Sequence, residues 1–199
     1  FAMAAGTTLS RRLIPSGPLP PLHCGTISVS ASDLISNPVS TSYPNSDGIV
    51  GAWTDQSGAA TNLYNVISDD LDATYIKATG SGVLAPYLVD IETPAITPMV
   101  GDLIQIPIRA RKIGAGSTFI NVSLWEGAVN KASQTFALSI ATTAYAMTLS
   151  DAQIASIANW ANVFFVFTAN CSASTCIVME ARLTRSLTAD AASAQLEGG

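Results

Sequence analysis

The sequence predicts an all-β protein: an antiparallel β-sandwich, jelly-roll-like, with one short helix and an extended N-terminal arm. Short β-prone runs separated by turn residues recur from about Ile27 onward, as an antiparallel sandwich requires. Apolar and polar residues alternate within several of these runs. The first 26 residues have a different, proline-rich composition. We therefore divide the chain into an arm (1–26), a sandwich domain (27–185) and a C-terminal tail (186–199).

The arm combines prolines with large aliphatic residues. The prolines are Pro15, Pro18, Pro20 and Pro21. Because proline fixes φ and lacks a backbone N–H, neither a helix nor a central strand persists there. The aliphatic residues, which are candidates for an interface, are Leu9, Leu13, Ile14, Leu19 and Leu22. They are too apolar for an ordinary solvated linker, so we expect the arm to lie in a groove of another chain; a disordered terminus is the alternative.

Eleven runs in the rest of the chain are predicted strands, and their number together with long crossovers favours a jelly roll over a simple meander. The runs are Thr26–Ser30, Ile49–Trp53, Asn62–Val66, Tyr75–Ala78, Val83–Asp90, Leu103–Arg111, Thr118–Trp125, Ser133–Ile140, Ala144–Leu149, Val163–Ala169 and Cys176–Leu183. The segment 114–116 (Gly-Ala-Gly) predicts a hairpin turn between two of them.

Alternation with a period of two predicts which side chains fill the core between the sheets. The inward set is Ile104, Ile106, Ile108, Ile120, Val122, Leu124, Phe165 and Phe167. Phe164 and Val166 are also apolar, so we expect their strand to be buried on both faces, against a helix or another subunit.

The one predicted helix runs roughly from Asp151 to Asn159. Ser150 and Asp151 are suitable caps, and Ile154 and Ile157 follow at helical spacing. We expect this helix to plug one end of the sandwich. The Ala/Ser-rich tail is compatible with a disordered end or with a short helix docked on a neighbour.

Composition restricts the partners of the protein. Charged residues make up only 12% of the chain and hydrophobic residues 48%, which predicts a homo-oligomer; a monomer with a Ser/Thr/Asn-rich surface is the alternative. By analogy with other sandwiches, we expect a trimer or a higher ring. A net charge of −5 with scattered basic residues argues against a nucleic-acid ligand. Arg109 and Arg111, on one face of a strand, form at most a small basic patch. The most apolar run, Val163–Phe167, is far shorter than the ~20 residues that span a membrane.

No catalytic, cofactor-binding or metal-binding set emerges, so we expect a protein that is not an enzyme. The single histidine, His23, lies in the arm, where nothing fixes its geometry. Asp69, Asp70 and Asp72 lack the glycine and the distal glutamate of an EF-hand, so a solvated loop is favoured over a calcium site.

Three cysteines and several aromatic residues remain to be assigned. With Cys24 remote, free buried thiols are favoured at Cys171 and Cys176, although a pair across a hairpin stays open. Aromatic residues on strands are more often core or intersubunit anchors than sugar platforms. The surface-binding candidates are Trp53, Trp125, Arg109 and Arg111.

Three stretches, Gly48–Thr79, Ile106–Gly127 and Thr148–Ala169, carry a recognisable series of motifs. The series has a tryptophan opening (Gly51-Ala52-Trp53), an acidic loop ending in Tyr75-Ile76, an Arg-x-Arg strand before a Gly-rich turn, and the helix start Leu149-Ser150-Asp151-x-Gln153. Together these motifs resemble a β-sandwich domain that recurs in virion proteins of tailed bacteriophages. The resemblance covers roughly residues 48–185.

This resemblance implies a structural protein of the virion, assembled in the cytoplasm of a bacterial host. The leading expectation is a capsid decoration (cement) or head-fibre-base protein that contacts other virion proteins such as the major capsid protein. The alternative is a tail or fibre component with a carbohydrate-binding sandwich for host adsorption. A small hydrolase is the least favoured interpretation. Neither repeats nor heptads are visible, which disfavours a long fibre.

Overall fold

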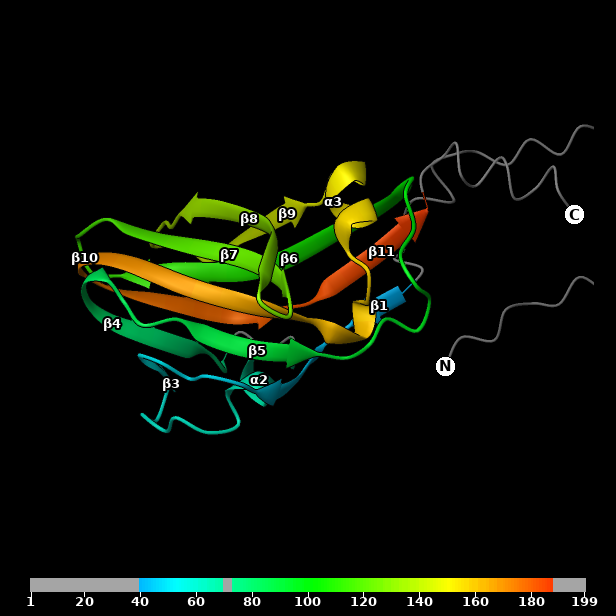
Figure 1. Cartoon of the computed structure of the whole chain (residues 1–199). Helices are drawn as coiled ribbons and strands as arrows, with labels where there is room; N and C mark the ends of the chain where they lie inside the picture. Colours follow the sequence, from blue (N-terminus) through cyan, green and yellow to red (C-terminus); the bar gives the residue numbers. More distant parts are fainter. Residues whose placement is uncertain (1–39, 70–72, 188–199) are drawn as a thin grey trace, which may run out of the picture.

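The computed structural model describes residues 40–69 and 73–187 (Figure 1). Eleven antiparallel strands form one hydrogen-bonded network that folds over into two layers, so the predicted β-sandwich is confirmed. The arm, the run Thr26–Ser30, and Asp70 and Asp72 fall outside the described residues, as does most of the tail; the predictions made for them stay predictions.

The first sheet has the strand order β8-β7-β10-β5-β2. Its strands are β8 (Val129–Ala137), β7 (Thr118–Glu126), the first half of β10 (Val163–Ala181), β5 (Tyr87–Ile91) and β2 (Pro44–Asp47). Every neighbouring pair in this order is antiparallel. β8 and β2 are therefore its two edges.

The second sheet is built around β6 (Asp102–Ile113), which pairs with β9 (Thr143–Thr148) on one edge. Its other edge pairs with the second half of β10 and then with β11 (Leu183–Leu187). Three further strands extend this sheet: β4 (Ile76–Val83) beside β10, β3 (Trp53–Asp55) beside β4, and β1 (Ser40–Ser42) beside β11.

The long strand β10 belongs to both layers. It pairs with β7 as far as Cys171 and with β6 from Thr175 onward. Between these points its register against β4 shifts, and Ala173 has φ 51°. Such a bulge bends a strand from one sheet into the other. The two predicted strands Val163–Ala169 and Cys176–Leu183 are therefore parts of one continuous strand, and the residues between them form its bend instead of a hairpin turn.

The β6–β7 hairpin lies against this bend. Its predicted turn is confirmed, since β6 ends at Ile113 and β7 begins at Thr118. A Cβ added to Gly116 would overlap with the carbonyl oxygen of Ser172. Glycine is therefore required here for the close approach of two backbones, in addition to its role in the turn.

The core between the layers contains every residue predicted for it. All eight of these side chains are buried, Ile108 being 1% exposed and the other seven fully buried. Two further aromatic rings, Trp53 and Tyr87, extend the cluster. The Tyr87 ring lies 6.4 Å from Trp53 and 6.1 Å from Phe167, measured between ring centroids. Burial of each large apolar side chain contributes roughly 1.5–3 kcal/mol, so this alternation is the main source of stability.

Within residues 40–69 and 73–187, two short α-helices are present, whereas the sequence predicted one. The run Asn62–Val66, predicted as a strand, instead forms most of α2 (Leu63–Ile67). Leu63 and Ile67, four residues apart, are both buried, as expected for one face of a helix. The prediction of a strand over Ile49–Trp53 is also mostly wrong, because only Trp53 belongs to a strand, β3 (Trp53–Asp55). The chain turns at Gly51, which has φ +62° and no room for a Cβ beside Pro86.

The one predicted helix is confirmed as α3 (Asp151–Ser156), three residues shorter than expected. Ser150 and Gln153 form a capping box at its start. A 3₁₀ turn, η1 (Trp160–Asn162), follows. Figure 1 places α3 near the end of the sandwich that carries β1 and β11. No helix in residues 40–69 and 73–187 is long and apolar enough to cross a membrane.

Phe164 and Val166 lie on the outer face of the first sheet and are half-buried. The residues that line the hollow around them are Pro86, Leu88, Trp125 and Gly127, none of which belongs to α2 or α3. Within the described residues, no helix covers them, so the expectation of a covering helix is not met there. Cover by another subunit stays a prediction.

Candidate functional site

The outer face of the first sheet presents two adjacent columns of side chains, one from β10 and one from β7. Successive side chains of a strand alternate between faces, so the partners of the buried core residues point outward. The paired outward residues are Phe164 with Trp125, Val166 with Ser123, Thr168 with Asn121, and Asn170 with Phe119. The columns are apolar at the Trp125 end and mostly polar at the Phe119 end.

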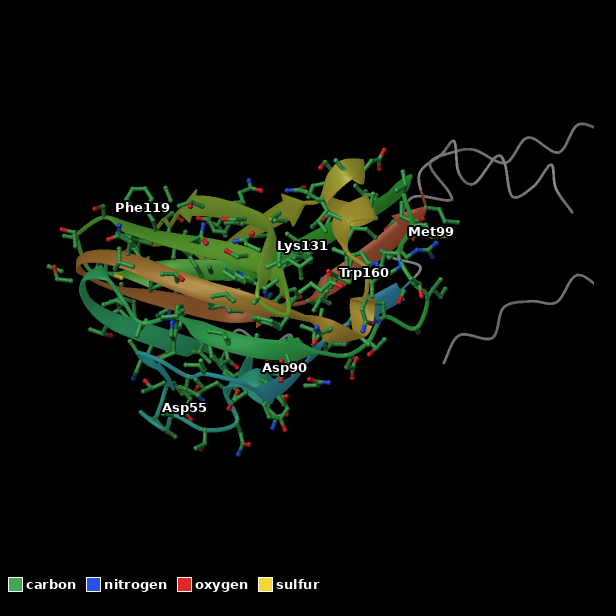
Figure 2. The ribbon with its side chains drawn as sticks, in the orientation of Figure 1. Asp55, Asp90, Met99, Phe119, Lys131 and Trp160 are labelled. Atoms are coloured by element: carbon green, nitrogen blue, oxygen red, sulfur yellow. The ribbon has the colours of Figure 1, made fainter. Side chains whose placement is uncertain are left out.

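A hollow of about 300 Å³ occupies the Phe119 end. We call it the polar hollow because four of its six lining side chains are amides or hydroxyls, although much of its exposed surface is apolar. It is lined by Val83, Phe119, Asn121, Thr135, Thr168 and Asn170. The ring of Phe119 is 40% exposed, although phenylalanine is usually buried. Figure 2 shows Phe119 at the end of the sandwich opposite to Met99. None of the side chains that line this hollow is charged.

The floor of the polar hollow is fixed by one amide. Asn121 donates hydrogen bonds of 3.0 Å from Nδ2 to Ser133 and to Thr135, and its Oδ1 accepts one of 2.7 Å from Ser123. Thr168 and Asn170 have no side-chain hydrogen bond to any residue in the described part of the chain. A rigid floor is thus flanked by a hydroxyl and an amide that are available to a ligand.

An apolar hollow of about 320 Å³ lies farther along the same two strands. It is lined by Pro86, Leu88, Trp125, Gly127, Phe164 and Val166. Trp125 was predicted as a surface-binding residue, and the structure places its half-buried ring in this lining. Beside it, the Glu126 carboxylate binds Lys131 at 2.9 Å, and this contact lowers the pKa of Glu126.

A second polar hollow, of about 260 Å³, adjoins the apolar one, and Phe164 lines both. Its polar side chains are Asn45, Ser46, Asp90, Thr93 and Asn162. Asp90 pairs with Phe164 across β5 and β10 and accepts a hydrogen bond of 2.9 Å from Ser46. Asp90 is labelled in Figure 2. Asp90, Phe164 and Trp125 thus form one row across three neighbouring strands.

The other predicted surface residues lie elsewhere. Trp53 is fully buried against Tyr87 and offers no surface to a ligand. The prediction that Trp53 is a surface-binding residue is therefore wrong. Its position on β3, paired with β4, turns the ring into the core. Arg109 and Arg111 belong to the second sheet, where Arg109 binds the buried Glu180 at 2.8 Å. They do not contribute to the three hollows, and their binding role stays a prediction.

Within the described residues, no group of three or more His, Cys, Asp or Glu side chains is placed to hold a metal ion. Asp69, the one member of the acidic loop that is described, accepts a hydrogen bond of 2.6 Å from Thr74.

Cys171 and Cys176 are both free and buried, so the interpretation as free thiols is confirmed and the pairing across a hairpin is not. Burial raises the pKa of both thiols. Because the thiolate is the reactive form, each should be poorly nucleophilic.

We expect neither thiol to react rapidly with an aromatic disulfide reagent at pH 8 in the native protein. A Cys24→Ser variant leaves only these two thiols for the measurement, and both should react once the protein is unfolded in denaturant. One equivalent released within seconds from the native variant would contradict the buried placement.

No protein-family model and no curated protein sequence matches this chain. The solved structures to which it is similar include the following three. The carbohydrate-binding module TmCBM61, in complex with β-1,4-galactotriose, has a TM-score of 0.38 at 5% identity, over 66% of this chain and 81% of that one. The module CBM4 has 0.40 at 15% identity, over 67% and 86%. The enzymatically active domain of tailspike protein 4 of bacteriophage CBA120 has 0.38 at 14% identity, over 72% of this chain but 19% of that one. These similarities concern the β-sandwich.

Proposed function

We propose that this chain is a non-catalytic carbohydrate-binding β-sandwich that takes an uncharged stretch of an oligosaccharide in the polar hollow of its first sheet. One observation carries the proposal. The exposed ring of Phe119 stands beside the side chains of Thr168 and Asn170, over the floor that Asn121 fixes.

These groups match the chemistry of a sugar ring. A sugar has a C–H face, which packs on an aromatic ring, and a rim of hydroxyls that both donate and accept hydrogen bonds. An amide supplies both a donor and an acceptor, and so does a hydroxyl. A phosphate or a carboxylate would instead be recognised through charge, and the lining of this hollow carries none.

The length of the face supports an oligosaccharide over a single sugar. Phe119 and Trp125 stand in the same column of β7, six residues apart, which is roughly 20 Å along a strand. A ligand of several sugar units that lies along the strands can therefore contact both rings.

The setting of this activity rests on the resemblance to virion proteins. On a phage particle, a sugar-binding sandwich serves adsorption to glycans of the host surface, as a tail or fibre component. The uncharged hollow supports this role over capsid decoration, which requires only contacts between proteins. In this interpretation the chain acts in the virion and catalyses no reaction.

Capsid decoration is the second candidate, and the end of the sandwich near α3 favours it. A groove of about 300 Å³ there is lined by Pro98, Met99, Val100, Ile154, Ile157 and Trp160, among others. Met99 and Val100 are exposed, and Figure 2 shows Met99 and Trp160 toward the same end. With so few charges in the chain, this surface suits the expected trimer or higher ring, or a contact with the major capsid protein.

The sugar site is tested by glycan-array screening of the full-length protein, followed by calorimetry with the best ligand. We expect Phe119→Ala to weaken binding at least tenfold, about 1.4 kcal/mol, through loss of the stacking ring. Asn170→Ala should weaken it by about 1 kcal/mol, through loss of hydrogen bonds to the sugar.

Two variants outside the hollow serve as matched controls. Tyr43→Ala removes an exposed aromatic ring, and Asn65→Ala removes an exposed amide on α2. Both should bind as the wild type does. If no oligosaccharide binds, or if the variants in the hollow bind as tightly as the controls, the proposal fails.

A further inference from the structure

We infer that the bound oligosaccharide carries an acetamido group, and that this group sits where the apolar hollow meets the second polar hollow. This inference rests on the proposed function and adds to it the chemical class of the sugar. It uses residues that the polar hollow at Phe119 does not include.

The row Asp90–Phe164–Trp125 brings three kinds of surface together. Phe164 lines both hollows, and its register partners are Asp90 on β5 and Trp125 on β7. Asn162, two residues before Phe164, lies in the lining of the second polar hollow, and its backbone carbonyl accepts the N–H of Gly127 at 3.2 Å. An acceptor, a donor and an apolar wall thus border one position.

An acetamido group needs those three surfaces at once. Its N–H requires an acceptor, its carbonyl requires a donor, and its methyl requires an apolar wall. Asp90 accepts the Ser46 hydroxyl through one carboxylate oxygen, which leaves acceptor capacity on the carboxylate. The side-chain amide of Asn162 has no hydrogen bond to any described residue, so it is available as the donor. Phe164, Trp125 and Leu88 supply the wall.

The surroundings of the apolar hollow argue against a protein as its occupant. The hollow follows the same two strands as the polar hollow at Phe119, and on its other side it adjoins the one at Asp90. A stable protein interface buries about 800 Å² on each partner around an apolar centre. A small apolar area between two sets of hydrogen-bonding groups instead fits a polar ligand with a small apolar substituent.

A set of matched ligands tests the inference. The β-1,4-linked tetramers of glucose and of galactose are each prepared with a hydroxyl, a free amine or an acetamido group at carbon 2. For any backbone that binds, we expect the acetamido form to bind at least tenfold more tightly than the hydroxyl form. The amine form should not exceed the acetamido form, because a cation at Asp90 would leave the apolar wall unused.

Variants then assign the preference to the row. Asn162→Ala should reduce the acetamido preference to less than threefold, while affinity for the hydroxyl form changes less than twofold. Trp125→Ala should reduce the preference to the same extent, but it should also weaken the hydroxyl form, because its ring contacts the sugar chain as well. Asn162 is exposed on a turn, so Asn162→Ala should fold normally. Its ligand preference can therefore be measured even if loss of the tryptophan ring disturbs the fold of Trp125→Ala. Phe119→Ala should lower the affinity of all three forms by the same factor.

The outcomes separate the two proposals. Binding without an acetamido preference, or tightest binding of the amine form, overturns this inference and leaves the sugar site standing. Absence of binding to every member of the set and to a broad glycan array overturns both. Self-association of the wild type that Trp125→Ala abolishes would identify the hollow as a contact between copies, and would also overturn the inference.

Discussion

Arg185→Leu should lower the free energy of unfolding by about 3–5 kcal/mol, the typical cost of removing one partner of a buried ion pair. Arg185 is 3% exposed, and Asp102 is 7% exposed. Arg185 Nε lies 2.6 Å from one carboxylate oxygen of Asp102 and Nη2 lies 3.1 Å from the other. The variant leaves this carboxylate buried beside an apolar side chain, with Met99 N–H at 2.7 Å as its remaining partner among the described residues. Urea unfolding followed by tryptophan fluorescence measures the loss.

The double variant Arg185→Leu/Asp102→Leu separates the net contribution of the pair from the cost of an orphaned charge. Because replacing both partners removes the uncompensated charge, it should recover much of the stability that the single variant loses. Lys77→Met is a matched control, since it removes a half-exposed cation from β4 and should cost less than about 1 kcal/mol. A loss in the single variant no larger than that of this control would contradict a structural role for the pair.

The position of this ion pair explains why its loss should affect the whole second sheet. Arg185 belongs to β11, and Asp102 begins β6. The backbone of Arg185 also pairs with Ile104 on one side and with Ser40 on the other. The pair therefore fixes the register of three strands where the sheet ends, and the sequence separation of 83 residues hid it from sequence analysis.

Local alternation made the core predictable. Ile104, Ile106 and Ile108 alternate with polar or partly polar neighbours, and a shift of one residue would expose all three, so only one register buries them. The same alternation put Phe119 and Asn121 on the opposite face of their strand. One column of the candidate site was therefore implicit in the sequence.

The second column was not predictable in the same way. Thr168 and Asn170 join Asn121 and Phe119 only because β10 pairs with β7, a strand far earlier in the chain. The burial of Trp53 likewise depends on strand pairing and on its packing against Tyr87. A tryptophan in a turn-rich segment carries no local signal that tells a core ring from a surface ring.

The errors at residues 172–175 and 62–66 have the same origin. Residues 172–175 have the composition of a turn, yet they form a bend because β4 and β6 flank the chain beyond them. The segment at 62–66 is too short for its periodicity to distinguish a strand from a helix. A side chain from β2 decides the matter: Asp47 accepts hydrogen bonds of 2.9 Å from the N–H groups of Leu63 and Tyr64.

Asp47→Ala should therefore lower the free energy of unfolding by about 2–4 kcal/mol, through two separate losses. Removing a side chain that caps a helix N-terminus typically costs about 1 kcal/mol. The same carboxylate accepts the hydroxyl of Tyr87 at 2.7 Å, and a buried hydroxyl without a partner costs about 1–3 kcal/mol more. Burial, followed by the neighbouring Asp47, raises the pKa of Tyr87, so this hydroxyl stays protonated and remains a donor.

A double-mutant cycle with Tyr87→Phe isolates the second loss. When Tyr87→Phe is already present, no hydroxyl is left unpaired at this position, so Asp47→Ala should cost only the loss of the cap, about 1 kcal/mol. Asp55→Ala is the matched control: Asp55, at the end of β3, also accepts a hydroxyl and a backbone N–H, from Ser57 and Ala59, but in exposed hydrogen bonds. It should cost under about 1 kcal/mol. Equal losses for Asp47→Ala with and without the Tyr87→Phe change would show that the carboxylate acts on α2 alone and that its contact with Tyr87 adds no stability.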